Sequence, residues 1–88
     1  MDNKEVQLTQ NYDIPKEEIL TVEEIFKRVY AALAEKGYDP VSQIVGYIMS
    51  GDPTYVTSHN NARGIICKVE RDELIEEAIA YYIEHKLK

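Results

Sequence analysis

The side chains that could catalyse a reaction or bind a metal ion are few, and their spacing supports neither role. His59 and His85 lie far apart in the sequence, and neither has a second ligand at the short spacing typical of zinc sites. Cys67 is the only cysteine, which leaves neither a metal cluster nor a disulfide framework. No Ser-His-Asp or Cys-His arrangement is suggested. We therefore expect no enzymatic activity, no metal and no other cofactor.

Two patterns resemble functional motifs without completing them. Gly46 and Gly51 have the spacing of a phosphate-binding loop, but the Lys-Ser or Lys-Thr that should follow is missing and no strand precedes them. Glu73 and Glu77 lie one helical turn apart, which is more typical of a solvated helix face than of an acid–base pair. We therefore reject nucleotide binding and interpret the two glutamates as surface residues.

The most basic part of this acidic protein contains His59, Arg63, Lys68 and Arg71. A guanidinium group can bind a carboxylate or a phosphate through two parallel hydrogen bonds. Arg63 and Arg71 are therefore the leading candidates for binding such a group. One interpretation is a face that binds a partner or a phosphate group. The other is ion pairing within the chain, with the acidic residues around Arg71, and the sequence does not decide between them.

Thr9 is the candidate for regulation by phosphorylation. It is the only Ser or Thr in residues 1–15, and a phosphate on it would add nearly two negative charges. This segment is mostly polar and lacks helical periodicity, which predicts a flexible regulatory tail. A short strand is the alternative, because Val6 and Leu8 alternate weakly with polar residues.

Residues 16–88 are predicted to form a single domain, since the whole chain has only 88 residues. A domain of this size buries roughly 60–65% of its unfolded surface, so self-association would add stability, and we expect a homodimer. The net charge of −6 disfavours long-range attraction to nucleic acid or to an anionic membrane, although a local basic patch stays open. No segment resembles a signal peptide or a bilayer span, which with a single thiol predicts a cytoplasmic protein.

Apolar periodicity predicts an all-α fold, a small compact bundle of about four to five short helices. Thr21 and Glu24 have capping-box spacing, which makes Thr21 the N-cap of the first helix, and Lys36 and Gly37 close it. The alternative is a start near Pro15, with the helix running through Thr21. The other predicted segments are a helix over 40–50, a helical turn over 52–56, a helix over 61–69, a break at 70–72 and a last helix to about His85.

Each predicted helix has an apolar face. Gly46 interrupts the face of the second helix and costs about 1 kcal/mol relative to Ala; it is either a tolerated glycine or a point of close helix approach. We expect the homodimer interface at Val45, Gly46, Ile48 and Met49. The residues expected on the four apolar faces are Val22, Ile25, Phe26, Val29, Tyr30 and Leu33; Val41, Ile44, Val45, Ile48 and Met49; Ala62, Ile65, Ile66 and Val69; and Leu74, Ile75, Ala78, Ile79, Tyr82 and Ile83.

Three segments together are unusual enough to suggest a family. They are KGYDPVSQIVGYIMSGDPTYV over 36–56, NAR over 61–63 and ERDELIEE over 70–77, with Tyr82 near the end. This pattern, over roughly residues 29–82, resembles the signature of the IreB/ReoM family of Gram-positive bacteria.

The resemblance implies a small, all-helical, cytoplasmic homodimer without known enzymatic activity. It also implies a substrate of a membrane Ser/Thr kinase with extracellular PASTA repeats and of its partner phosphatase, modified on a tail threonine, here Thr9. Unphosphorylated members of this family restrain peptidoglycan synthesis by promoting Clp-protease turnover of MurA. Phosphorylation relieves the restraint and affects cell-wall antibiotic tolerance.

The chain departs from the family pattern at the positions that would carry regulation. Gln10 stands where relatives have an apolar residue after the threonine, and Ser58 and Cys67 stand where relatives usually have Arg. A basic face with these changes should engage its partner more weakly or engage a different one. The competing interpretation is a helix-turn-helix-like nucleic-acid-binding protein, because short helices joined by glycine-containing turns look alike, but the net charge argues against it.

Overall fold

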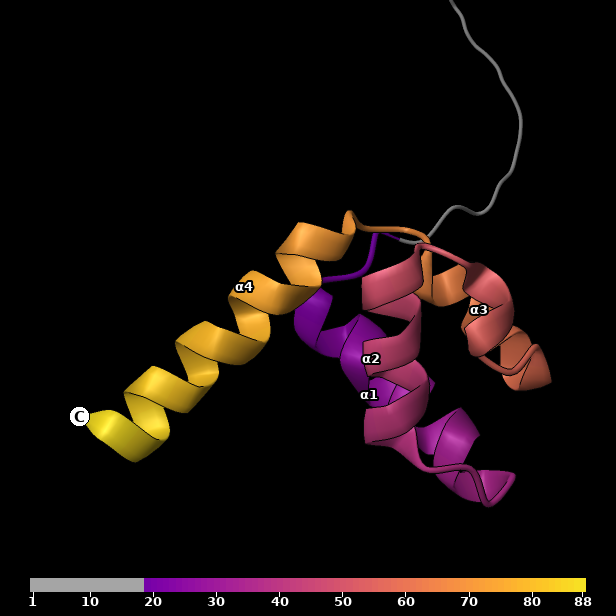
Figure 1. The fold of residues 1–88 in the computed structure, drawn as a ribbon, viewed down its shortest axis with the longest axis horizontal. Helices are drawn as coiled ribbons and strands as arrows, with labels where there is room; N and C mark the ends of the chain where they lie inside the picture. Colours follow the sequence, from indigo (N-terminus) through magenta and orange to yellow (C-terminus); the bar gives the residue numbers. More distant parts are fainter. Residues whose placement is uncertain (1–18) are drawn as a thin grey trace, which may run out of the picture.

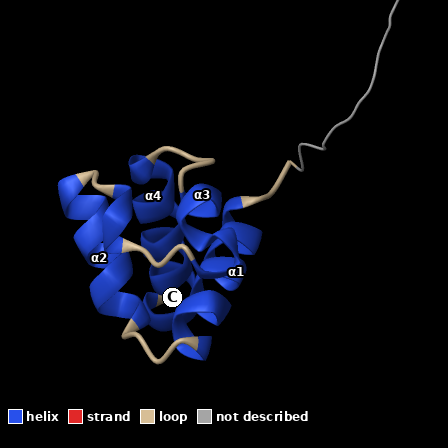
Figure 2. Ribbon diagram, turned by 90° about the vertical axis from the view of Figure 1, so that its right-hand side faces the viewer, coloured by secondary structure: helices blue, strands red, loops and turns tan. Residues whose placement is uncertain are grey.

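The structure, a computed structural model, describes residues 19–88. The Thr9 candidate and the whole of the predicted tail, residues 1–15, lie outside the described residues. The predicted all-α class is confirmed, since the described residues contain only helices and loops (Figure 2). In chain order the elements are α1 (Val22–Glu35), α2 (Pro40–Ser50), the 3₁₀ turns η2 (Pro53–Tyr55) and η3 (His59–Asn61), α3 (Ala62–Ile66), α4 (Arg71–Tyr82) and the terminal π-helical turn η4 (Ile83–Leu87).

The first helix begins where its capping box predicts. Thr21 has extended backbone angles, and its hydroxyl accepts a hydrogen bond from the Glu24 amide at 3.1 Å. The Glu24 carboxylate accepts from the Thr21 amide in return, at 3.0 Å. Because these bonds satisfy amides that have no partner inside the helix, the start at residue 22 is confirmed, and a helix running through residue 21 is wrong.

The second helix has both of its predicted boundaries. The Asp39 carboxylate accepts from the Val41 amide at 3.2 Å, and Pro40 occupies the first helical position. At the other end Gly51 adopts φ +75°, a left-handed conformation that glycine tolerates best, and its amide donates to the Tyr47 carbonyl at 2.7 Å.

Gly46 makes room for an aromatic ring of the same chain. A Cβ atom at this position would lie 2.5 Å from Cδ1 of Tyr55. The ring of η2 therefore packs directly on the backbone of α2, and the glycine is required for that contact. The glycine is therefore more than tolerated, but a side chain of the same chain requires it, and not the predicted close approach of a helix.

The third helix is shorter than predicted. It ends at Ile66 instead of continuing to residue 69, because Glu70 takes up extended angles and forms a second capping box with Glu73. The predicted break is thereby confirmed, at residues 67–70 instead of 70–72. The chain enters α3 through Asn60 and Asn61, which have φ +52° and +60°, conformations that asparagine adopts more readily than most residues.

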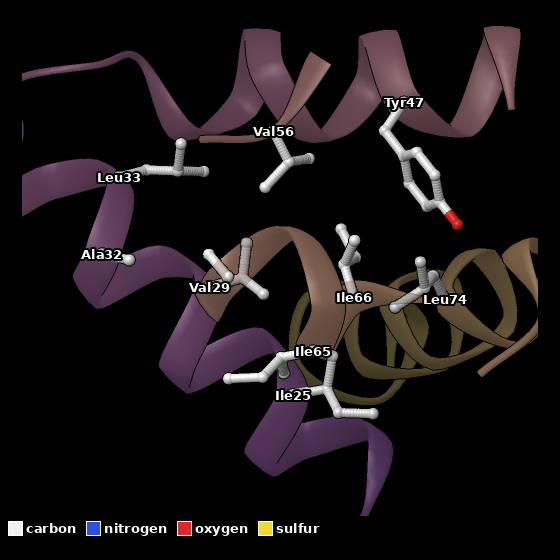
Figure 3. Close-up of a cluster of buried hydrophobic side chains, with 10 residues drawn as sticks. Ile25, Val29, Ala32, Leu33, Tyr47, Val56, Ile65, Ile66 and Leu74 are labelled. Atoms are coloured by element: carbon white, nitrogen blue, oxygen red, sulfur yellow. The ribbon is translucent and has the colours of Figure 1, made fainter. Parts of the chain in front are cut away.

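The core lies between α1, α2 and α3, with one contribution from α4 (Figure 3). The short helix α3 packs mainly against α1. Ten of the described residues are buried: Ile25, Val29, Ala32 and Leu33 of α1, Tyr47 of α2, Val56, Ala62, Ile65 and Ile66 in and before α3, and Leu74 of α4.

Two of the predicted apolar faces are not buried as expected. In α2 the buried residue is Tyr47, and Met49, expected on the inner face, is 78% exposed. In α4 only Leu74 is buried, whereas Ile79 and Tyr82 are more than half exposed. The reason is visible in Figure 1, where α4 projects away from the other helices. The inward prediction is therefore wrong for most of α4 within a single chain.

Candidate functional site

An apolar groove lies between α1, α2 and the projecting helix α4, and we call it the α1–α2–α4 groove. Its volume is about 1000 Å³, and Lys27 is its only charged lining residue. Val45 and Ile48 of the predicted interface line it, whereas Gly46 and Met49 do not. The complete lining is Phe26, Lys27 and Tyr30 of α1, Pro40, Val41, Ile44, Val45 and Ile48 of α2, and Leu74, Ile75, Ala78, Ile79 and Tyr81 of α4.

Arg71 holds the start of α4 against the end of α2. Its Nη1 donates to the Ile48 carbonyl at 2.9 Å, which lies in the last turn of α2, where helix carbonyls lack intrahelical partners and carry partial negative charge. The guanidinium packs against Gly51, where an added Cβ would lie 2.9 Å from Nη1. The glycine is therefore needed both for its backbone angle and for this contact.

Arg63 also donates to a backbone carbonyl, but in a different place. Its Nε lies 2.9 Å from the oxygen of Val56, a fully buried residue before η3. Within residues 19–88 neither Arg63 nor Arg71 forms an ion pair. The predicted pairing with neighbouring acidic residues is therefore wrong for the described part of the chain.

His59 and Lys68 complete the set of basic candidates. The ring Nε2 of His59 lies 2.9 Å from Oε1 of Glu35 at the end of α1, and Asn60 donates to the same oxygen at 3.2 Å. The hydrogen bond with His59, more than any other cause, lowers the pKa of the Glu35 carboxyl group. Lys68 is exposed in the turn after α3. The structure thus gives three of the four basic residues separate local partners.

A polar pocket lies beside Arg63, at the start of α2 and along the segment from η2 to α3. Its volume is about 390 Å³, and no carboxylate lines it. Apart from Arg63, sequence reasoning did not identify these residues as a site, because they come from separate segments without a shared motif. The lining residues are Tyr38, Gln43, Thr54, Tyr55, Thr57, Ser58 and Arg63.

Cys67 is exposed, and the Tyr47 hydroxyl donates to its sulfur at 3.8 Å. Burial, followed by this hydrogen bond, raises the pKa of Tyr47. In residues 19–88 there is no group of three or more His, Cys, Asp or Glu side chains that could hold a metal ion. Over the same residues, no helix is long and apolar enough to cross a bilayer.

Over the described residues the protein is small and all-helical, and its surface carries the α1–α2–α4 groove and the polar pocket beside Arg63. A model of the family described as "IreB regulatory phosphoprotein" matches residues 7–84. The chain therefore belongs to the IreB family of regulatory phosphoproteins.

Three similar proteins from bacteria carry the name "UPF0297 protein". The chain is 55% identical, over 97% of its length and 97% of the relative's, to a "UPF0297 protein" of Lachnoclostridium phytofermentans. It is 52% identical to one of Acetivibrio thermocellus, over 96% of this chain and 90% of that one. It is 47% identical to one of Clostridioides difficile, over 94% and 98%. These three matches span almost the whole of this chain and at least 90% of each relative.

Proposed function

We propose that this chain is a non-enzymatic, cytoplasmic regulatory phosphoprotein, phosphorylated on Thr9 by a PASTA-type Ser/Thr kinase and dephosphorylated by its cognate phosphatase. Its task is to control peptidoglycan synthesis, and with it cell-wall antibiotic tolerance, through Clp-dependent turnover of MurA. The observation that supports this most strongly is the match to a family of regulatory phosphoproteins over residues 7–84, a span that includes Thr9.

The use of the polar side chains supports a binding role over a catalytic one. Arg63 and Arg71 donate to backbone carbonyls, and His59 pairs with a carboxylate at the surface. These side chains fix the turns that join the helices. The remaining donors of Arg63 and Arg71, with Lys68 and His59, are the basic groups through which the chain would engage MurA or the Clp machinery, and we refer to them together as the basic surface.

The active form is proposed to be a homodimer that closes the α1–α2–α4 groove. Val45 of α2 and Ile79 of α4 are half exposed there, and a projecting helix with an apolar side gains stability only when something covers it. A second copy offers the same groove and the same helix, as a two-fold symmetric contact requires. Val45 and Ile48 would then lie in the interface, and Gly46 and Met49 would lie at its edge.

The function can be tested by following MurA in cells. In a strain that lacks the native gene, the chain with Thr9→Ala should shorten the half-life of MurA at least as much as the wild-type chain, because it cannot be phosphorylated. Arg63→Ala with Arg71→Ala should lengthen it toward that of the deletion strain. A MurA half-life that is the same in all four strains would refute the proposed pathway.

A further inference from the structure

The polar pocket beside Arg63 contains several side-chain hydrogen-bond donors that have no acceptor within the described residues. Gln43 comes from the first turns of α2, Ser58 from the segment before η3, and Arg63 from α3. Within residues 19–88 no hydrogen bond involves the side chains of Gln43 or Ser58, and the Tyr38 and Tyr55 hydroxyls are equally unbonded. The Thr57 hydroxyl accepts from the His59 amide at 3.2 Å, which leaves its own proton available to a ligand.

Arg63 is held in place before any ligand arrives. Its Nε is committed to the Val56 carbonyl, and within residues 19–88 its two terminal nitrogens have no partner. A guanidinium fixed at one edge loses less side-chain entropy on binding than a free one. Its remaining N–H groups are therefore preorganised to donate to an anion.

Asp52, a carboxylate that interacts electrostatically with Arg63, does not line the pocket. The pKa of Asp52 is lowered mainly by hydrogen bonds from Thr54. The positive charge of Arg63 also lowers it, but to a smaller extent. The Thr54 hydroxyl and amide donate to one oxygen of Asp52 at 2.7 Å and 3.0 Å. Arg71 provides a contrast, because the hollow beside it is lined by both Glu70 and Asp72. Of the two arginines, only Arg63 lies in a pocket without acidic residues.

We propose that this pocket is a receptor for a phosphate monoester, namely the phosphate on Thr9 of the same chain. A phosphate dianion offers three acceptor oxygens that point in different directions, which suits donors arriving from several segments better than a planar carboxylate does. Thr9 lies twelve residues before Thr21, a span of at most about 40 Å. The structure measures 49 × 32 × 22 Å, so the span is comparable with the size of the molecule.

This inference rests on the proposed function for its ligand, and it links phosphorylation to the basic surface. An unphosphorylated tail leaves Arg63 available to a partner. A phosphorylated tail occupies the pocket and covers that arginine, so the modification switches the surface off by competition.

The test uses full-length protein in which phosphothreonine is placed at position 9 by chemical ligation, so that no kinase is needed. Amide and arginine side-chain resonances of phosphorylated and unmodified protein are compared by NMR. We expect shifts at Gln43, Ser58 and Arg63 that do not change on tenfold dilution. Absence of shifts at these residues would overturn the pocket. Shifts that fade on dilution would overturn its intramolecular occupation and assign the phosphate to another copy.

A second arm titrates a synthetic peptide of residues 5–13 carrying phosphothreonine into unmodified protein. Arg63→Gln should weaken binding about tenfold or more, because a charged hydrogen-bond donor is lost. Gln43→Ala with Ser58→Ala should also weaken it while leaving the Arg63–Val56 bond intact, which guards against an effect of misfolding. The matched control is Arg71→Gln, the other arginine bonded to a carbonyl, which should change the affinity by less than about twofold.

Each remaining outcome counts against a particular part of the proposal. Equal losses from Arg63→Gln and Arg71→Gln would overturn the pocket as the binding site. Inorganic phosphate binding as tightly as the peptide would overturn the tail as the ligand. Failure of the kinase to modify the chain would refute the proposed function alone, since neither arm uses the kinase.

Discussion

At the scale of single residues, the contact between Gly46 and Tyr55 shows how a missing side chain can position a neighbouring segment. The ring fills the space that a Cβ would occupy, and it joins η2 to α2 beside the polar pocket. A helix normally gains stability when an internal glycine is replaced by alanine. Here the contact opposes that gain, so the sign of the mutational effect reveals whether the packing is real.

We predict that Gly46→Ala destabilises the protein by about 1–3 kcal/mol, because the ring must shift to avoid the new methyl group. In a Tyr55→Ala background the same change should stabilise by about 1 kcal/mol, since only the helix propensity remains. Urea denaturation of the four proteins completes the double-mutant cycle. A stabilising Gly46→Ala in the wild-type background would contradict the contact.

A second prediction at this scale concerns acid stability. The pKa of Glu35 is lowered in the folded protein, chiefly by its hydrogen bond with His59, so its contribution to stability is present above its ordinary pKa of 4.5 and is lost as the pH falls through the lower folded value. Glu35→Gln should therefore lose less thermal stability than wild type between pH 5.5 and pH 3. The control is Glu76→Gln, whose profile should follow wild type; identical profiles for Glu35→Gln and wild type would contradict the pair.

Local chemistry explains which residues and boundaries could be predicted from the sequence. The start of α1 and both ends of α2 depend on capping residues and glycines within a few residues of the boundary. The sequence therefore predicts these boundaries correctly. The end of α3 depends on how Glu70 caps the next helix, and the exposure of α4 depends on what the rest of the fold leaves uncovered. The carbonyl partners of Arg63 and Arg71 and the donors of the polar pocket come from distant segments, which periodicity and spacing do not reveal.

At the scale of elements, α4 is attached to the body mainly near its beginning. Arg71 bonds to the end of α2, and Leu74 is the one residue of this helix that is fully buried. The helix then projects from the body (Figure 1), and its apolar side borders the α1–α2–α4 groove. The position of α4 therefore depends on very few side chains.

We predict that Leu74→Ala lowers the free energy of unfolding by about 2–5 kcal/mol, the usual range for removing a buried leucine side chain. Leu87→Ala is the matched control, because this leucine is 67% exposed and its truncation should cost less than about 0.5 kcal/mol. Chemical denaturation followed by circular dichroism measures both values. Equal losses would show that Leu74 does not anchor the helix.

At the scale of the whole molecule, the account requires two surfaces with different partners. In this proposal the apolar groove would face a second copy, and the polar pocket with the basic side chains would face the phosphorylated tail or a protein partner. Self-association and phosphorylation should then be separable by mutation, because the groove and the pocket share no lining residue.

We predict that the protein has twice its chain mass of 10.2 kDa in light scattering at about 50 μM, and that Val45→Glu gives the monomer mass, because an interface does not tolerate an unpaired buried charge. Val45 is half exposed in the single chain, so the fold should survive. Met49→Glu, one turn along the same helix but outside the groove, should leave the dimer largely intact. A wild-type protein that stays monomeric would refute the dimer.

The most direct test of the central claim is to incubate the full-length protein with its cognate PASTA-type kinase and to map the modified residues by mass spectrometry. The account predicts one phosphate, located on Thr9, which disappears in Thr9→Ala and is removed by the cognate phosphatase. A chain that remains unmodified, or one that is phosphorylated only at other residues in both proteins, would contradict regulation through Thr9.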